Sequence, residues 1–178
     1  MQKLSSDALE RRTVPEFRAM EKRPVYIVLD NMRSLNNIGS VFRTCDAFAV
    51  KKLYLCGITA RPPHKDIQRT ALGATESVEW EYFERTVDAV EALKEQRVRV
   101  LAVEQVEGSE MLDDLRPRPV QKYALVFGNE VFGVEQEVVD ACDGALEVPQ
   151  EGTKHSLNVA VCVGVVLWDV FSKLRQIS

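Results

Sequence analysis

A chain of 178 residues is long enough for one domain with a sizeable core and too short for two domains of ordinary size. Hydrophobic residues make up 46% of it and the net charge is −4, as in an ordinary globular protein. With only two histidines, a His-rich metal site is not expected. The longest apolar run, residues 159–168, is far shorter than the roughly 20 residues that span a bilayer.

The start of the chain carries mixed charge and no apolar segment of the kind found in signal peptides, so a cytoplasmic protein without membrane contact is predicted. The four cysteines show no metal-like spacing: Cys45, Cys56, Cys142 and Cys162. We therefore expect free, buried thiols and neither a metal site nor a disulfide framework.

Strands and helices are predicted to alternate along the chain. Residues 1–24 lack strong periodicity and are predicted to be an N-terminal extension, followed by one domain over residues 25–178. Strands are predicted at 25–29, 53–56, 98–103, 124–127 and 145–148. Helices are predicted from a cap at Asn36 or Asn37 to about 48, from near Asp66, over 86–96, near 135–142, and up to about 174.

This alternation predicts an α/β fold with a mostly parallel sheet covered by helices. The connection at residues 108–119 contains two prolines and several charges, and it is predicted to be exposed.

Three of the predicted strands end in loops rich in Gly or Asn, at residues 30–44, 128–134 and 148–158. In open α/β sheets, ligands bind beyond the carboxyl ends of the strands, so three such loops predict one shared site. In the third loop, Pro149 and Gly152 break regular structure. Ser156 is predicted to cap the helix that follows, with Asn158 in its first turn. Such a loop presents many backbone amides and carbonyls to one place, which suits an adenosine-like ligand.

The three loops resemble the three motifs of the SPOUT superfamily, in its SpoU (TrmH-type) branch of RNA 2′-O-ribose methyltransferases. Asn37 and Arg43 resemble the first motif, an Asn followed six positions later by the catalytic Arg. The second motif is matched by Phe127-Gly128-Asn129-Glu130 with Gly133, and the third by Pro149, Gly152 and Ser156-Leu157-Asn158. One departure is Gln150, where the family often has Met, and this would alter one wall of the adenine pocket without abolishing binding.

The resemblance implies a SPOUT-type fold with a deep trefoil knot near the C-terminus and a homodimer whose active site lies at the subunit interface. It implies methylation of a ribose 2′-hydroxyl in structured RNA by S-adenosyl-L-methionine, with tRNA slightly favoured over rRNA. The implied catalytic residues are Arg43, Asn37, Glu130, Ser156 and Asn158. The implied cofactor-binding residues are Leu125, Val126, Phe127, Gly128, Val148, Pro149, Gln150, Gly152, Ser156 and Leu157.

Charge is unevenly distributed, with a balance of +6 over residues 1–74 and −10 over residues 75–178. A basic patch can therefore exist on this acidic protein and contact RNA. The candidate RNA-binding residues are Arg11, Arg12, Arg18, Arg23, Arg33, Arg61, Lys65 and Arg69. The alternative is a solvated charged face, which is what most charge runs are.

Arg43 is predicted to act as a fixed cation that holds a phosphate and stabilises the developing alkoxide, because a guanidinium group stays protonated far above neutral pH. Asn37 and Ser156 have helix capping as an alternative role, and Glu130 could be a solvated loop carboxylate or a dimer contact. A non-catalytic RNA-binding module with the same fold is the alternative function. A dinucleotide-binding fingerprint is not supported, because the glycines are too sparse.

Overall fold

The computed structural model describes residues 3, 12–154 and 156–177. Within them lies a seven-stranded sheet in the order β3-β2-β1-β6-β4-β7-β5, and all its neighbouring strands are parallel. The strands are β1 (Arg23–Asp30), β2 (Val50–Cys56), β3 (Trp80–Phe83), β4 (Val98–Val103), β5 (Glu110–Met111), β6 (Lys122–Phe127) and β7 (Gly144–Glu147). The predicted α/β class with a parallel sheet is confirmed.

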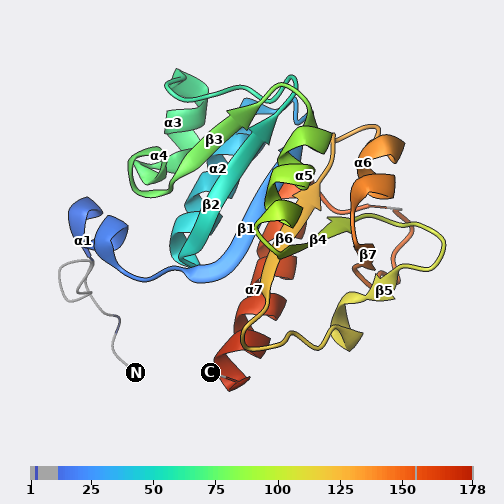
Figure 1. Ribbon diagram of the computed structural model, residues 1–178. Helices are drawn as coiled ribbons and strands as arrows, with labels where there is room; N and C mark the ends of the chain where they lie inside the picture. Colours follow the sequence, from blue (N-terminus) through green and yellow to red (C-terminus); the bar gives the residue numbers. More distant parts are fainter. Residues whose placement is uncertain (1–2, 4–11, 155, 178) are drawn as a thin grey trace.

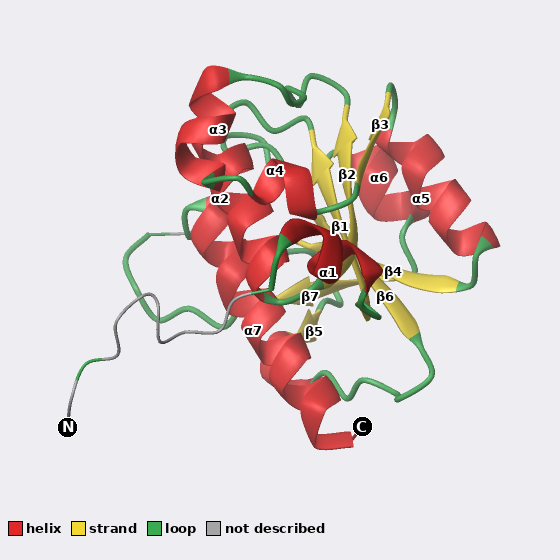
Figure 2. Ribbon diagram, turned by 90° about the vertical axis from the view of Figure 1, so that its left-hand side faces the viewer, coloured by secondary structure: helices red, strands yellow, loops and turns green. Residues whose placement is uncertain are grey.

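Helices cover both faces of the sheet, as Figures 1 and 2 show. On one side lie α2 (Leu35–Ala47), α3 (Lys65–Ala71), α4 (Ala74–Ser77) and α7 (Val159–Ile177), and on the other lie α5 (Thr86–Glu95) and α6 (Gln136–Ala141). A short helix, α1 (Val14–Ala19), precedes the sheet and contacts α4, and a 3-10 turn, η2 (Leu112–Asp114), follows β5.

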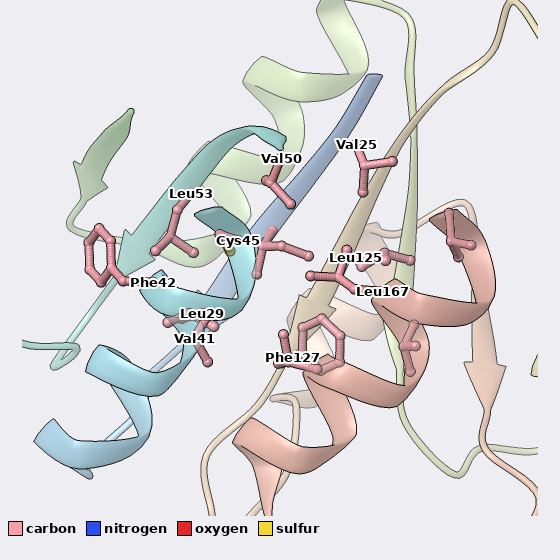
Figure 3. Close-up of a cluster of buried hydrophobic side chains, with 14 of the residues drawn as sticks. Val25, Leu29, Val41, Phe42, Cys45, Val50, Leu53, Leu125, Phe127 and Leu167 are labelled. Carbon is pink, nitrogen blue, oxygen red and sulfur yellow. The ribbon is translucent and has the colours of Figure 1, made fainter. Parts of the chain in front are cut away.

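The central strands are buried on both faces, which explains their nearly continuous apolar sequences. In β1, Val25, Ile27 and Leu29 point into the core shared with α2 and α7, whereas Tyr26 and Val28 point into the core shared with α5. This is the period-two alternation of a strand. Figure 3 shows the first core, in which Leu125 and Phe127 of β6 lie close to Leu167 of α7.

Helix capping differs in detail from the prediction. Helix α2 begins at Leu35 because the Ser34 side chain accepts the Asn37 backbone N–H, so the cap lies earlier than Asn36 or Asn37. Helix α1 begins with a capping box, in which Thr13 and Glu16 bond each other's backbone N–H groups.

Two edge strands and two short helical segments were not predicted. β3 is a strand of only four residues, three of them half-buried aromatics, and β5 is only two residues long within the connection predicted to be exposed. α4 and η2 span four and three residues, too short to show a 3.6-residue period.

All four cysteines are free, as predicted; Cys45 and Cys56 are buried, whereas Cys142 and Cys162 are half-buried. Burial raises the pKa of the Cys56 thiol to about 12 and that of Cys162 to about 11. Across the described part of the chain, no group of three or more His, Cys, Asp or Glu side chains could hold a metal ion. No described helix combines the length and apolar character needed to cross a membrane.

Candidate active site

The sheet order brings the three predicted loops to one edge. β1 and β6 are neighbours, and only β4 separates β6 from β7. Because all the strands are parallel, the segments that follow β1, β6 and β7 emerge on the same side (Figure 1). A shared location for the three motifs therefore follows from topology.

The Glu130 carboxylate, in the loop after β6, holds the loop after β1. One oxygen, Oε2, accepts the Arg33 N–H at 2.9 Å, and Oε1 accepts the Ser34 N–H at 2.9 Å and Asn37 Nδ2 at 3.1 Å. Partial burial raises the pKa of Glu130, but the hydrogen bonds from Arg33, Ser34 and Asn37 outweigh it, so the pKa lies below its ordinary value of 4.5. Glu130 is thus an ionised carboxylate that joins the second motif to the first by hydrogen bonds.

Asn158 joins the third motif to the first. Its Nδ2 donates to Asn37 Oδ1 at 3.3 Å, while its own Oδ1 accepts the N–H groups of Ala160 at 3.0 Å and Val161 at 3.3 Å. Asn158 is therefore the N-cap of α7, and the prediction of a cap at Ser156 was wrong by two residues. The run Glu130–Asn37–Asn158 links all three loops through side chains.

The loop after β6 is a tight hairpin that only glycine permits at two positions. The backbone groups of Asn129 and Gly133 bond each other in both directions, each at 2.9 Å. A Cβ on Gly128 would lie 2.0 Å from the Gly133 carbonyl carbon, and one on Gly133, whose φ is +70°, would lie 2.2 Å from Glu104 Oε2. Glu104 also accepts the Val134 N–H at 3.0 Å, which fixes the end of the hairpin.

A buried carboxylate at the end of β1 holds the starts of these loops together. Asp30, at the end of β1, is fully buried, and it accepts the Thr86 hydroxyl at 2.6 Å and the Glu135 N–H at 2.9 Å. Asn31 then donates to Asp30 at 3.1 Å and to Glu135 at 2.9 Å. A buried charge of this kind needs such hydrogen bonds, so it anchors the ends of β1 and the hairpin together.

A cavity of about 480 Å³ lies beside the linked loops. Many of the predicted site residues line it: Phe127, Gly128, Glu130, Val148, Gln150, Ser156, Leu157 and Asn158. Leu125 and Val126 are buried within β6, and Pro149 and Gly152 are exposed, and none of these four is among its lining residues.

Several lining residues were not predicted: Val103, Glu104, Gln105, Phe132, Glu147 and Cys162. Val103 ends the predicted strand 98–103 and Glu104 and Gln105 follow it, so the carboxyl-edge argument used for the other loops would have found them. Nothing in the sequence distinguishes Cys162 from the other apolar positions of its helix.

Arg43 lies apart from the linked loops. Six helical positions separate it from Asn37, which places the two side chains about 120° apart around the axis and about 9 Å apart along it. Arg43 is exposed and lines a second cavity, of about 530 Å³, together with Arg12 and residues of α1 and α4. One copy of the chain does not bring Arg43 to Glu130.

The predicted RNA-binding residues fall into two groups. Arg33 and Arg61 follow β1 and β2 at the carboxyl edge, where Arg61 stacks on Tyr82 at 4.2 Å. Lys65 and Arg69 lie on α3 next to them, and Arg69 donates to Asn36 at 2.9 Å. The others lie on or near α1 and the start of β1: Arg12, Arg18 and Arg23. Arg11 lies outside the described residues.

Replacing Glu130 with Gln should lower stability in a pH-dependent way, because the amide offers one acceptor oxygen where the carboxylate offers two. The folded-state pKa is lowered, so the contribution of the carboxylate is fully present above pH 4.5 and is lost as the pH falls through the folded-state value. The free energies of unfolding of wild type and Glu130→Gln should differ by about 1 kcal/mol at pH 7.

Urea unfolding at pH 7 and at successive steps below pH 4.5 measures this difference, which should shrink towards the acid end. The control is Glu107→Gln, an exposed residue of the connection before β5, expected to change stability by less than about 0.5 kcal/mol. A difference between wild type and Glu130→Gln that stays constant down to pH 3 would contradict the claim that an ionised Glu130 stabilises the fold.

These features define an α/β protein in which three loops meet beside one cavity at the carboxyl edge of a parallel sheet. The chain belongs to the SpoU rRNA Methylase family, whose model matches residues 24–168.

The chain is similar to proteins with established names. It is 31% identical over 165 residues to the tRNA (guanosine(18)-2'-O)-methyltransferase of Aquifex aeolicus, which covers 90% of this chain and 76% of that protein. It is 29% identical over 160 residues to the enzyme of the same name from Thermus thermophilus, covering 89% and 80%. Its fold matches the AdoMet-bound rRNA methyltransferase of Sinorhizobium meliloti, with a TM-score of 0.79 and 25% identity over 89% of this chain and 60% of the other.

Proposed function

We propose that this protein transfers a methyl group from S-adenosyl-L-methionine to a ribose 2′-hydroxyl in structured RNA. The observation that carries the proposal is the side-chain run Glu130–Asn37–Asn158, which joins all three motifs beside one cavity. The similarity to named tRNA and rRNA 2′-O-methyltransferases supports it.

The cavity suits the cofactor in its chemistry. Phe127, Val148 and Leu157 give it apolar surface. The carboxylates of Glu104, Glu130 and Glu147 line it as well, so its electrostatics favour a cationic ligand. The cofactor, when bound, supplies an electrophilic methyl group next to a sulfonium. The residues of the chain would bind and orient it.

We propose a homodimer in which Arg43 of one subunit completes the site of the other. Val161, Val165 and Trp168 recur at spacings of four and three along α7, so they form one exposed stripe, and Trp168 is 57% exposed. An exposed apolar stripe of this kind is typical of protein interfaces. In a two-fold dimer the same surface serves both subunits. Each subunit can then present its separately placed Arg43 to the partner's cavity.

The path of the chain supports the deep trefoil knot that the family resemblance implies. β7 lies near one end of the sheet, where β4 separates it from β6, whereas α7 packs beside α2 and against Leu125 and Phe127 of β6. The segment between β7 and α7 therefore runs back across the carboxyl edge, over the strands that hold the first two motifs.

In the complex with RNA and cofactor, the residues of the chain would act by orienting the substrate and stabilising charge. A 2′-hydroxyl is a poor nucleophile until it is strongly polarised or loses its proton. A fixed guanidinium at Arg43 would hold the neighbouring phosphate and stabilise the alkoxide charge as it develops. Asn37, held by Glu130 and Asn158, would orient the ribose. tRNA is the favoured substrate, and the separate basic groups at α1 and at the carboxyl edge would contact different stretches of its backbone.

The test is transfer of labelled methyl from S-adenosyl-L-methionine to size-fractionated RNA from cells that lack this protein, followed by nuclease digestion to nucleosides. Label in a 2′-O-methylnucleoside is expected, in the tRNA fraction rather than the rRNA fraction. Glu107→Gln serves as a control that should retain full transfer. Cofactor binding without any labelled nucleoside would favour a non-catalytic RNA-binding protein.

A further inference from the structure

Phe132 is an exposed aromatic side chain beside the cavity, with no role so far in the proposed function. It is 81% exposed, although phenylalanine is among the residue types most often buried. It also lines the cavity of about 480 Å³. An aromatic ring held in water at the mouth of a ligand site needs an explanation.

The hairpin that carries Phe132 is rigid, so the ring is presented rather than left loose. Asn129 Oδ1 accepts the N–H groups of Val131 at 2.9 Å and Phe132 at 3.3 Å, inside the Asn129–Gly133 backbone pair. Asn129 Nδ2 also donates to the Asn31 carbonyl at 2.8 Å, which ties the hairpin to the loop after β1. The tip is therefore fixed at its base, and its two apolar side chains point away from the core.

The surroundings of Phe132 match an RNA-binding surface. Two residues before it, Glu130 holds the backbone of Arg33, whose side chain is exposed on the adjoining loop. Exposed aromatic and arginine side chains beside each other are the combination with which proteins hold single-stranded nucleotides, through base stacking and phosphate contact.

We infer that Phe132 is the stacking surface for the base of the nucleotide that is methylated. This inference rests on the proposed function. A ribose whose 2′-hydroxyl enters the cavity must carry its base to the rim, and a base removed from its own stack needs a new one. Phe132 supplies a flat apolar face at that rim, and stacking of this kind accepts any base. It positions the substrate and takes no part in the proton or methyl transfer.

The inference predicts a selective loss of RNA affinity. Phe132→Ala and Phe132→Leu should each raise the Kd for an end-labelled, unmodified tRNA transcript pool, and the KM in methyl transfer, by roughly 5- to 150-fold. Phe132→Tyr, which keeps the ring, should stay within about threefold of wild type. The Kd for S-adenosylhomocysteine, measured by calorimetry, should be unchanged, as should the oligomeric state. The control is Val120→Ala, which removes a 95% exposed apolar side chain ahead of β6, at the opposite edge of the sheet.

Three results would overturn the inference. Phe132→Leu matching wild type would show that apolar contact suffices without a ring. Altered cofactor affinity would assign Phe132 to the cofactor, and dissociation into monomers would assign it to the subunit interface. RNA binding is measured without turnover, so it decides the role of Phe132 even if wild type transfers no methyl group. That last result would instead refute the proposed function.

Discussion

Arg43→Ala should reduce methyl transfer by about 10²- to 10³-fold while leaving cofactor affinity unchanged, because it removes a fixed cation aimed at developing negative charge. The cofactor should bind normally because Arg43 lines the second cavity, next to α1, and not the cavity between the motif loops. Single-turnover methylation and calorimetry with S-adenosylhomocysteine measure the two quantities. Arg97→Ala, which removes an exposed cation in the turn before β4, is the matched control and should retain full activity.

Mixed dimers test whether Arg43 acts across the interface. Arg43→Ala and Asn37→Ala should each be inactive, but a dimer that contains one of each carries one site with both residues intact. Such dimers, co-expressed and purified through two different affinity tags, should recover about half of the wild-type activity. If both residues act within one subunit, the mixed dimer stays as inactive as its parents, and the composite site is wrong.

Gly128→Ala should be among the most damaging single-methyl changes in the protein. The added Cβ would lie 2.0 Å from the Gly133 carbonyl carbon and 2.1 Å from the Val134 nitrogen, so backbone and not a flexible side chain must move. We expect a loss of about 4 kcal/mol in the free energy of unfolding, or an opened hairpin that no longer binds the cofactor. Urea unfolding and calorimetry distinguish these two results.

Gly144→Ala is the matched control, because its Cβ would meet only Leu101 Cδ2 at an ordinary 3.5 Å. Its effect on the free energy of unfolding should stay within about 1 kcal/mol. If Gly128→Ala is tolerated equally well in both stability and cofactor affinity, the hairpin is not as tightly closed as its contacts indicate.

The core strands could be predicted because a strand that is buried on both faces has a continuous run of apolar residues, as β1 does. The edge strands leave no such run, because β3 has only four residues, none of them fully buried, and β5 pairs through two residues only. Helix α1 carries a Thr-x-x-Glu capping signature at Thr13 and Glu16 that could have located it. The cap of α7 could not be chosen from sequence, since Ser156 and Asn158 are both good caps.

In the site, the residue types pointed to the right loops but not to the contacts between them. Glu130 bonds a backbone 97 residues earlier in the chain, and such pairings depend on strand order, which no local pattern encodes. The separation of Arg43 from Asn37 follows from simple helix geometry once α2 is known to contain both.

The strand order has a consequence for how the protein is made. β6 lies between β1 and β4, so one edge of β1 stays unpaired until the strand that begins at residue 122 has been made. The bond between Asn37 and Asn158 spans 121 residues and forms only when the last helix has docked. Contacts so distant along the chain slow folding. On the ribosome, the first motif is therefore synthesised long before its partners, and the site is completed in the final step of folding.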